Sequence, residues 1–230
     1  MNIDLNCDMG ELEDGGAQDA RLMEYVTSAN IACGGHAGDE ITMERTARLA
    51  LARGVQIGAH PSYPDRANFG RLEISMPPQE IEASLGDQIR RLENVVRVLG
   101  GEIAHVKPHG ALYNVAARDP EIARAIGAAV RNWNSAATIF GLARSRCLEV
   151  WREMGLKVAA EAFADRRYEP DGSLRSRQFP DALITDPHEA AGQAVRLARA
   201  GTAQTICVHG DTAGAVEILK ACREALRGLQ

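Results

Sequence analysis

The chain has 230 residues, of which 45% are hydrophobic, 25% are charged and only 4% are aromatic, and its formal net charge is −5. This composition is that of an ordinary folded domain and excludes collagen, coiled coils and extended disorder. The lack of a basic block argues against nucleic acid as a partner, and no apolar run approaches the roughly 20 residues of a membrane span. The first twenty residues carry no Lys or Arg, which argues against a targeting peptide. We therefore expect a single soluble, cytoplasmic domain over residues 1–230.

Strand and helix patterns alternate along the chain. Alternating apolar residues predict strands at 3–7, 29–33, 55–60, 102–107, 137–142, 157–163 and 204–209, with a weaker candidate at 182–185. Capping residues and proline at the first helical position indicate where helices start. We place these starts at Asp39, Pro77-Pro78, Asp119-Pro120, Asp186-Pro187 and, for the final helix, after Asp211-Thr212.

Short connections between alternating strands and helices imply parallel pairing with right-handed crossovers. Seven or eight such units in 230 residues fit one closed barrel better than two domains. An open, doubly wound sheet is the alternative. The predicted fold class is α/β, a (β/α) barrel with about seven parallel strands.

Polar residues gather where the predicted strands end, which is where parallel barrels carry their active sites. Four of the six histidines stand at these ends, whereas His105 and His188 are expected to be structural. A lone histidine there is more often structural, but four on one rim favour a functional site. The candidate catalytic residues are Asp8, His36, His60, Lys107 and His109, and the candidates for binding substrate or nucleotide are Asn6, Glu11, Gly34, Gly35, Asp65, Tyr113, Glu161, Asp165, Arg166, His209 and Asp211.

Lys107 stands out because lysine occurs only three times in the chain. A compact ammonium beside His109 suits an anionic group or negative charge developing on an oxygen. A salt bridge to Glu161 or Asp165 is an equally weighted alternative.

The sequence leaves open two kinds of ion site, one for a metal ion and one for an anion. Asp8, His36 and His60 follow three successive strands and resemble a facial set for Zn²⁺ or Mn²⁺, although no local motif fixes it. Two glycine-rich turns, at 34–38 and 210–214, present backbone N–H groups at helix starts and could cradle an anion. Asp211 in the second turn would repel a bare phosphate, which implies Mg²⁺ or another role. Neither turn is a P-loop.

Five cysteines without a C-x-x-C pair indicate a reducing compartment and no zinc ribbon. Cys7 and Cys33 could be nucleophiles, but we favour packing as small buried side chains.

Six sequence blocks carry a family resemblance. They are DLNCDMGE at 4–11, SANIACGGHAGD at 28–39, GAHP at 58–61, VKPHGALYN at 106–114, FADR at 163–166 and CVHGD at 207–211. Together, in this order, they resemble the LamB/YcsF family, although any one block alone would be a weak signal.

The resemblance implies an irregular (β/α) barrel of the glycoside hydrolase/deacetylase superfamily. It also implies a component of the bacterial ATP-dependent 5-oxoprolinase, which acts with subunits B and C, uses ATP with Mg²⁺ and opens 5-oxo-L-proline to L-glutamate. The alternatives are a metal-dependent amidase or carbohydrate deacetylase, and a non-catalytic binding subunit. The sequence leaves a homo-oligomer open.

Opening a lactam in this way needs a base, an oxyanion stabiliser and a clamp for the substrate carboxylate. We expect His60 or Asp8 to be the base. Lys107 and His109 would stabilise the amide oxygen or its phosphoryl group. Arg166 would hold the carboxylate as a bidentate pair.

The chain departs from the family pattern in several loops. Gly35 stands where the family usually has a bulky residue, and Ser62 stands where it usually has glycine. The segment after Glu11 is short and lacks an aromatic residue, and a hairpin is missing between Ala200 and Gln204. These changes are expected to affect substrate fit and subunit docking.

Overall fold

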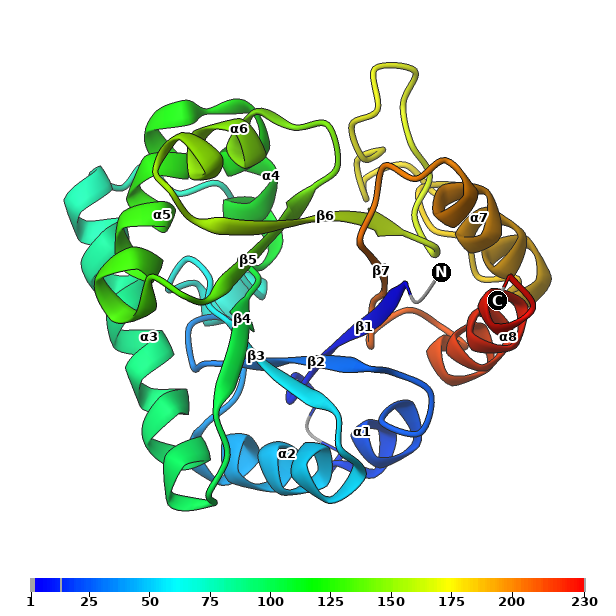
Figure 1. Cartoon of the computed structure of the whole chain (residues 1–230), viewed down its shortest axis with the longest axis horizontal. Coiled ribbons are helices and arrows are strands. Elements are labelled where there is room, and N and C mark those ends of the chain that lie inside the picture. Colours follow the sequence, from blue (N-terminus) through cyan, green and yellow to red (C-terminus); the bar gives the residue numbers. More distant parts are fainter. Residues whose placement is uncertain (1–2, 13, 230) are drawn as a thin grey trace.

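The computed structural model describes residues 3–12 and 14–229 and folds them into a closed parallel barrel (Figure 1). Each strand pairs with the next along the chain, and the last pairs with the first to close the ring. The strands are β1 (Asp4–Met9), β2 (Ser28–Ala32), β3 (Gln56–His60), β4 (Ile103–Val106), β5 (Thr138–Leu142), β6 (Lys157–Phe163) and β7 (Thr205–Val208). The predicted barrel is confirmed, and the open sheet is excluded.

The weak strand candidate at 182–185 is wrong. Leu183 makes only an isolated antiparallel bridge to Arg166, within the long connection that follows β6. The apolar pattern there has another cause, because Ile184 packs in the main hydrophobic core.

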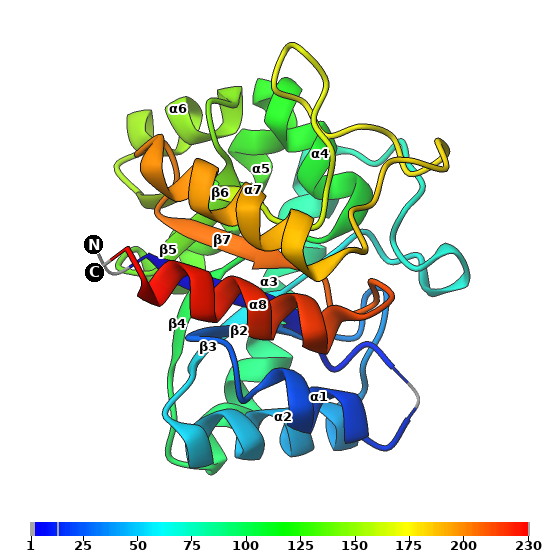
Figure 2. The same ribbon diagram turned by 90° about the vertical axis from the view of Figure 1, so that its right-hand side faces the viewer.

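Helices form the outer layer around the barrel (Figure 2). Asp39, Asp119 and Asp186 each accept a backbone N–H from the first turn of the helix that they precede, as their capping role predicts. Among the described residues, no helix is both long and apolar enough to cross a membrane. The helices are α1 (Ala17–Leu22), α2 (Glu40–Arg53), α3 (Pro78–Val98), α4 (Gly110–Arg118), α5 (Pro120–Asn134), α6 (Arg146–Glu153), α7 (Pro187–Arg199) and α8 (Ala215–Arg227), with a 3₁₀ turn, η1 (Arg66–Asn68), after β3.

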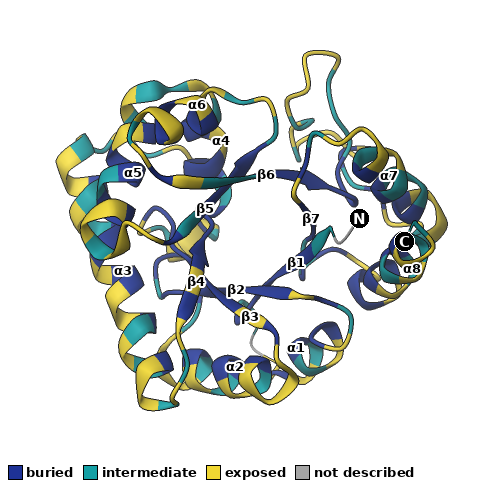
Figure 3. Cartoon of the chain, in the orientation of Figure 1, coloured by how far each residue is buried: buried dark blue, intermediate teal, exposed yellow. Residues whose placement is uncertain are grey.

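The main hydrophobic core lies between the strands and the helices, and the strands are largely buried (Figure 3). Leu5, Cys7 and Met9 alternate along β1 and belong to this core. Cys33 is also buried there, and burial raises its pKa to about 12 and that of Cys7 well above the usual value. Both thiols therefore pack as apolar groups, as expected.

The barrel interior is polar, where such barrels usually hold layers of branched apolar side chains. His105 fills its middle, with Nε2 2.7 Å from Asn30 Oδ1 and its ring stacked on Phe140 at 4.1 Å. A Cβ on Gly58 of β3 would lie 2.0 Å from His105 Nε2, so glycine is required at that position. His105 thus has the structural role expected for it.

Candidate active site

The buried ammonium of Lys107 organises the carboxyl-end half of the barrel interior. Lys107 directly follows β4, and its Nζ lies 2.8 Å from Asp8 Oδ1 and 3.0 Å from Glu161 Oε1. The side chains of all three residues are at most 3% exposed. Of the two salt-bridge partners that the sequence offered as an alternative role for Lys107, Glu161 is present and Asp165 is not, and Asp8 is the second partner.

Two amides hold these carboxylates in place. Asn30 Nδ2 donates to Asp8 Oδ1 at 2.8 Å and to Asn6 Oδ1 at 2.7 Å. Asn6 Nδ2 donates to Glu161 Oε1 at 2.9 Å. Within the described part of the chain, Glu161 Oε2 has no hydrogen-bond partner. Buried networks of this kind are rigid, so they hold the ion pair in a fixed position for a ligand.

The pKa values of Asp8 and Lys107 move apart, as in an ion pair. Burial alone would lower the pKa of Lys107, but the charge of Asp8 leads the groups that raise it well above its usual value. Burial alone would raise the pKa of Asp8, but His60 and Lys107 hold it well below its usual value. At neutral pH the pair is therefore an ammonium and a carboxylate.

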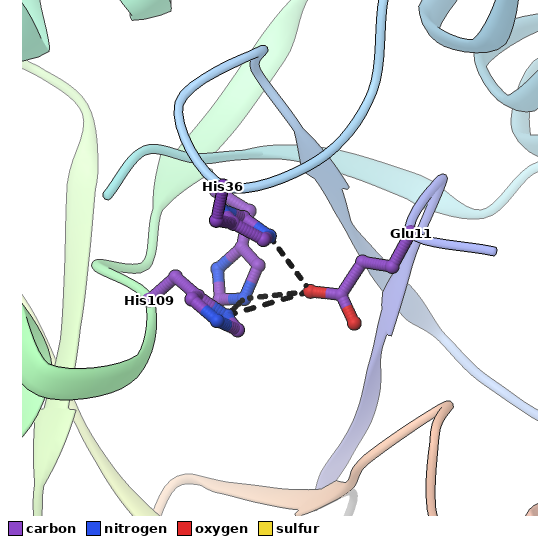
Figure 4. A group of neighbouring side chains, drawn as sticks. Glu11, His36 and His109 are labelled. Atoms are coloured by element: carbon purple, nitrogen blue, oxygen red, sulfur yellow. Dashed lines mark hydrogen bonds and ion pairs between the residues drawn. The ribbon is translucent and has the colours of Figure 1, made fainter. Parts of the chain in front are cut away.

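Three histidines converge on Glu11 beside this ion pair (Figure 4). Glu11 Oε1 lies 2.9 Å from His36 Nε2, 3.4 Å from His109 Nδ1 and 3.7 Å from His60 Nε2. The rings of His36 and His109 stack at 3.6 Å. Glu11, His36 and His109 follow β1, β2 and β4, and His60 is the last residue of β3, so barrel closure brings the four together.

Backbone carbonyls determine the tautomers of two of these rings. His60 Nδ1 lies 2.7 Å from the carbonyl oxygen of Lys107, and His109 Nε2 lies 3.0 Å from that of Phe69. Because a carbonyl oxygen only accepts, both nitrogens must carry hydrogen. In the neutral rings the remaining nitrogens, His60 Nε2 and His109 Nδ1, are lone pairs that face each other at 2.9 Å.

Burial dominates ionisation in this cluster. Burial, with the charge of Asp8, raises the pKa of Glu11 to about 8. It lowers the pKa of His36 to about 3 and that of His109 well below its usual value. The rings of His36 and His109 are therefore neutral at physiological pH and keep a lone pair available for a ligand.

Asp165 holds the turn that follows β7. Its Oδ2 accepts from Thr212 Oγ1 at 2.6 Å and from the backbone N–H of His209 at 3.1 Å. His209 Nδ1 lies 3.0 Å from the same oxygen. His209 lines the cavity that opens over the ion pair, so Asp165 positions part of the cavity wall.

Asp211, in the glycine-rich turn 210–214, pairs with Arg71 and with Arg177. Burial alone would raise its pKa, but Arg177 leads the cations that lower it. Arg71 and Arg177 therefore compensate the charge of Asp211, for which the sequence suggested Mg²⁺ or another role.

This cavity over the ion pair has a volume of about 1040 Å³, with Asp8, His60, Lys107 and His109 in its lining. Its lining contains seven Lys and Arg side chains, five of which pair with carboxylates. Among the described residues, Arg144 and Arg166 have no carboxylate partner, so these two favour an anionic ligand. Besides Lys107, the cations are Arg71, Arg118, Arg144, Arg146, Arg166 and Arg177.

Arg166 is the unusual cation of this cavity because it is 5% exposed. One Nη donates to the carbonyl oxygen of Arg175 at 2.7 Å, but Nε has no partner and no carboxylate pairs with Arg166 among the described residues. Burial, with the charge of Arg177, lowers its pKa to about 10. A buried cation without a counter-ion is costly, which suits a position that meets an anionic group of a ligand.

The remaining candidates are divided between this cavity and other parts of the molecule. Tyr113 lines the same cavity, and its buried hydroxyl has no partner in the described chain. Gly34 borders a separate cavity of about 590 Å³ between α2 and α3. Asp65 caps η1 through the backbone N–H of Asn68, and Gly35 packs against Ser62 and Gln88. None of these last three lines the larger cavity.

Sequence reasoning missed three residues of the site. Asn30 is a polar residue between Ala29 and Ile31 in a buried strand. Its side-chain amide needs hydrogen-bond partners there, and this could have indicated a polar network inside the barrel. Cys207 has its Sγ 3.0 Å from Lys107 Nζ. Arg177 reaches the cavity from the long segment after β6, whose course no periodic pattern reveals.

The LamB/YcsF family pattern matches residues 3–230. The chain belongs to the LamB/YcsF family. Two curated relatives, each named as the A subunit of 5-oxoprolinase, come from Chloroflexus aggregans at 50% identity and Chloroflexus aurantiacus at 46%, covering 98% of this chain and 95% of each relative. The solved lactam utilization protein from Thermus thermophilus is 40% identical with a TM-score of 0.92, covering 100% of this chain and 97% of that one.

The family resemblance of the six sequence blocks is thereby confirmed. The barrel of this LamB/YcsF member also superimposes along its full length on that of the solved Thermus thermophilus protein.

Proposed function

We propose that this chain is one subunit of an ATP-dependent 5-oxoprolinase. With subunits B and C, it opens 5-oxo-L-proline to L-glutamate while ATP, bound with Mg²⁺, is hydrolysed to ADP and phosphate. The names of relatives at up to 50% identity support this. The structural observation that carries the proposal is Arg166, a buried cation without a counter-ion in a cavity rich in cations. The substrate carboxylate and the phosphates of ATP are both anions that such a cavity favours.

The chemistry requires an activated lactam, because an amide carbon is a poor electrophile. Attack of the lactam oxygen on the γ-phosphorus releases ADP and leaves that oxygen phosphorylated, which makes the carbon bonded to it electrophilic. Water adds to that carbon, the C–N bond breaks, and the resulting γ-glutamyl phosphate reacts with a second water to give glutamate and phosphate. Each water gives up a proton, and negative charge develops on oxygen at the reacting carbon.

The residues at the cavity floor suit these needs. Lys107 stabilises the charge on the lactam oxygen or its phosphoryl group, while Arg166 binds the substrate carboxylate. The expected help from His109 would need a proton on its Nδ1, because the neutral ring gives its one N–H to the carbonyl oxygen of Phe69. The base is His60 or Asp8. Asp8 Oδ1 is held by Lys107, and its Oδ2 lies 3.4 Å from His60 Nε2, so the two candidates share one side of the cavity.

The test is glutamate release from 5-oxoproline and ATP by this chain reconstituted with subunits B and C. Arg166→Gln should raise KM for 5-oxoproline about tenfold or more, since a charge-assisted hydrogen bond is worth about 1.5–3 kcal/mol. Arg167→Gln is the matched control, because Arg167 is 42% exposed and pairs with Glu189. Absence of glutamate in every combination of subunits would contradict the proposal.

A metal-dependent amidase or carbohydrate deacetylase is the second candidate, favoured by the three histidines around Glu11. It predicts hydrolysis without ATP or partner subunits. A non-catalytic binding subunit predicts instead that complexes carrying His60→Ala or Lys107→Ala assemble and keep full activity.

A further inference from the structure

The side chains around Glu11 offer four ligand atoms in one small, buried volume. The atoms of Glu11, His36, His60 and His109 all lie within 4.8 Å of one another. Three imidazole nitrogens and one carboxylate oxygen form a donor set typical of Zn²⁺. We infer that these four residues form a binding site for a divalent transition-metal ion, with Zn²⁺ as the best-fitting occupant.

The contact between His60 and His109 supports a cation independently of the donor count. Backbone carbonyls accept the N–H of His60 Nδ1 and of His109 Nε2, so His60 Nε2 and His109 Nδ1 face each other at 2.9 Å, and a proton or a metal ion must lie between them. Lone pairs at this distance repel unless a cation engages them. Ligand atoms about 2.0–2.1 Å from a tetrahedral zinc lie roughly 3.3 Å apart. Glu11 Oε1 lies 2.9, 3.4 and 3.7 Å from the three ring nitrogens, so these separations are near that value.

The surroundings of the rings match those of metal-ligating histidines. Such a ring usually donates its second N–H to a carbonyl or carboxylate, which fixes its orientation. His60 donates to the carbonyl oxygen of Lys107, and His109 donates to that of Phe69. Figure 4 shows the ring of His36 directed at Glu11. This ring lies parallel to that of His109 at 3.6 Å, so one of the two rings must turn for both to face a single ion.

Asp8 is better placed as a partner of Lys107 than as a metal ligand. The sequence grouped it with His36 and His60, but Asp8 Oδ1 lies 2.8 Å from the Lys107 ammonium. A second candidate group, made of Asp8, Cys207 and His209, surrounds the same ammonium, with Lys107 Nζ 3.0 Å from Cys207 Sγ. A cation already occupies that position and would repel a metal ion.

The site bears on the choice between His60 and Asp8 as the base. With His60 Nε2 engaged by a metal ion, Asp8 Oδ2 is the base that remains on the cavity side. Bound zinc polarises a carbonyl oxygen or lowers the pKa of a water molecule. The inference does not depend on the proposed reaction, because binding can be measured without 5-oxoproline, ATP or partner subunits.

The test uses the purified full chain, stripped with a chelator and then titrated with Zn²⁺ or Co²⁺. We expect one zinc per chain by elemental analysis after dialysis, a higher Tm with zinc, and the visible absorption of tetrahedral cobalt. Glu11→Gln and His109→Asn should each weaken zinc binding at least about a hundredfold, since even outer-shell partners are worth about 10–100-fold. His188→Asn, on the exposed side of α7, and His209→Asn should keep the metal.

Two results would overturn the inference. The first is a wild-type chain that binds no stoichiometric zinc or cobalt, which would mean that a proton alone separates His60 and His109. The second is zinc binding that survives Glu11→Gln and His109→Asn but is lost with His209→Asn. The wild-type measurement can overturn the inference even if a variant fails to fold.

Discussion

At the residue scale, Lys107 shows how one side chain can hold a polar barrel interior together. It balances two carboxylates, Asp8 and Glu161, that are both almost completely buried. We predict that Lys107→Met lowers the free energy of unfolding by about 3–5 kcal/mol, because it leaves buried charges without a partner. Adding Asp8→Asn to the same chain should recover part of the loss, since one uncompensated carboxylate is removed.

Urea denaturation at pH 7 measures this effect. Lys157→Met is the control, because Lys157 is exposed at the start of β6. Equal destabilisation by the two lysine variants would show that the buried ion pair contributes little.

Gly35 and Ser62, which the sequence marks as two separate departures from the family pattern, lie against each other in the structure. A Cβ on Gly35 would lie 2.4 Å from Ser62 Oγ and 2.4 Å from Gln88 Oε1. Gln88 fixes the backbone of Ser62 through hydrogen bonds of 3.0 Å and 2.8 Å. Ser62 and Gln88 therefore occupy the space that a side chain at position 35 would need. This contact could not be predicted from the sequence, because the two residues lie on different loops.

At the element scale, helix starts could be predicted where a side chain caps its own helix. Asp39, Asp119 and Asp186 do so, and α2, α5 and α7 begin next to them. Helix α4 could not be predicted in this way, because no side chain caps it. Its start depends on the distant Gly70, whose carbonyl oxygen accepts the N–H of Ala111 at 2.9 Å.

Asp165 links two elements, and its contribution should depend on pH. It joins the end of β6 to the turn before α8 through His209 and Thr212. Burial opposes ionisation, but His209 and then Thr212 lower the pKa of Asp165. Its stabilising effect is therefore complete above the unfolded value of 3.8 and is lost as the pH falls through the lower folded value.

We predict that Asp165→Asn lowers the free energy of unfolding by about 1–3 kcal/mol at pH 7, and that this difference shrinks below about pH 4. Urea denaturation of both chains between pH 3 and pH 8 measures it. Asp87→Asn, on the exposed surface of α3, should change little at any pH. A difference that grows towards acid would contradict the assigned charge state of Asp165.

At the scale of the whole molecule, barrel closure decides which rim residues touch. Parallel strands share a direction, so each strand-end histidine could be placed on one rim from the sequence. The side chains that each histidine contacts could not be predicted, because these contacts depend on how the loops cross that rim. Glu11 reaches His36, His60 and His109 from the loop after β1, whereas Asp8 turns inward to Lys107. The sequence therefore predicts the membership of the site better than its pairings.

Asp4, at the amino end of β1, lies where the barrel closes between β7 and β1. Asp4 accepts hydrogen bonds from Ser28 at 2.7 Å and Thr205 at 2.5 Å, and so ties β1 to both neighbouring strands. We predict that Asp4→Ala lowers the free energy of unfolding by about 1–3 kcal/mol, because these hydroxyls lose their acceptor. Asp4→Asn keeps one acceptor oxygen and should recover part of the loss.

Near-ultraviolet and far-ultraviolet circular dichroism during urea unfolding measure this closure. Both signals should move to lower urea together in Asp4→Ala, because opening the ring between β7 and β1 exposes the core on every side. Asp87→Ala, on the exposed surface of α3, should leave both transitions in place. A near-ultraviolet change without a far-ultraviolet one would mean that Asp4 orders only its local turn, and that backbone pairing between β1 and β7 closes the barrel without it.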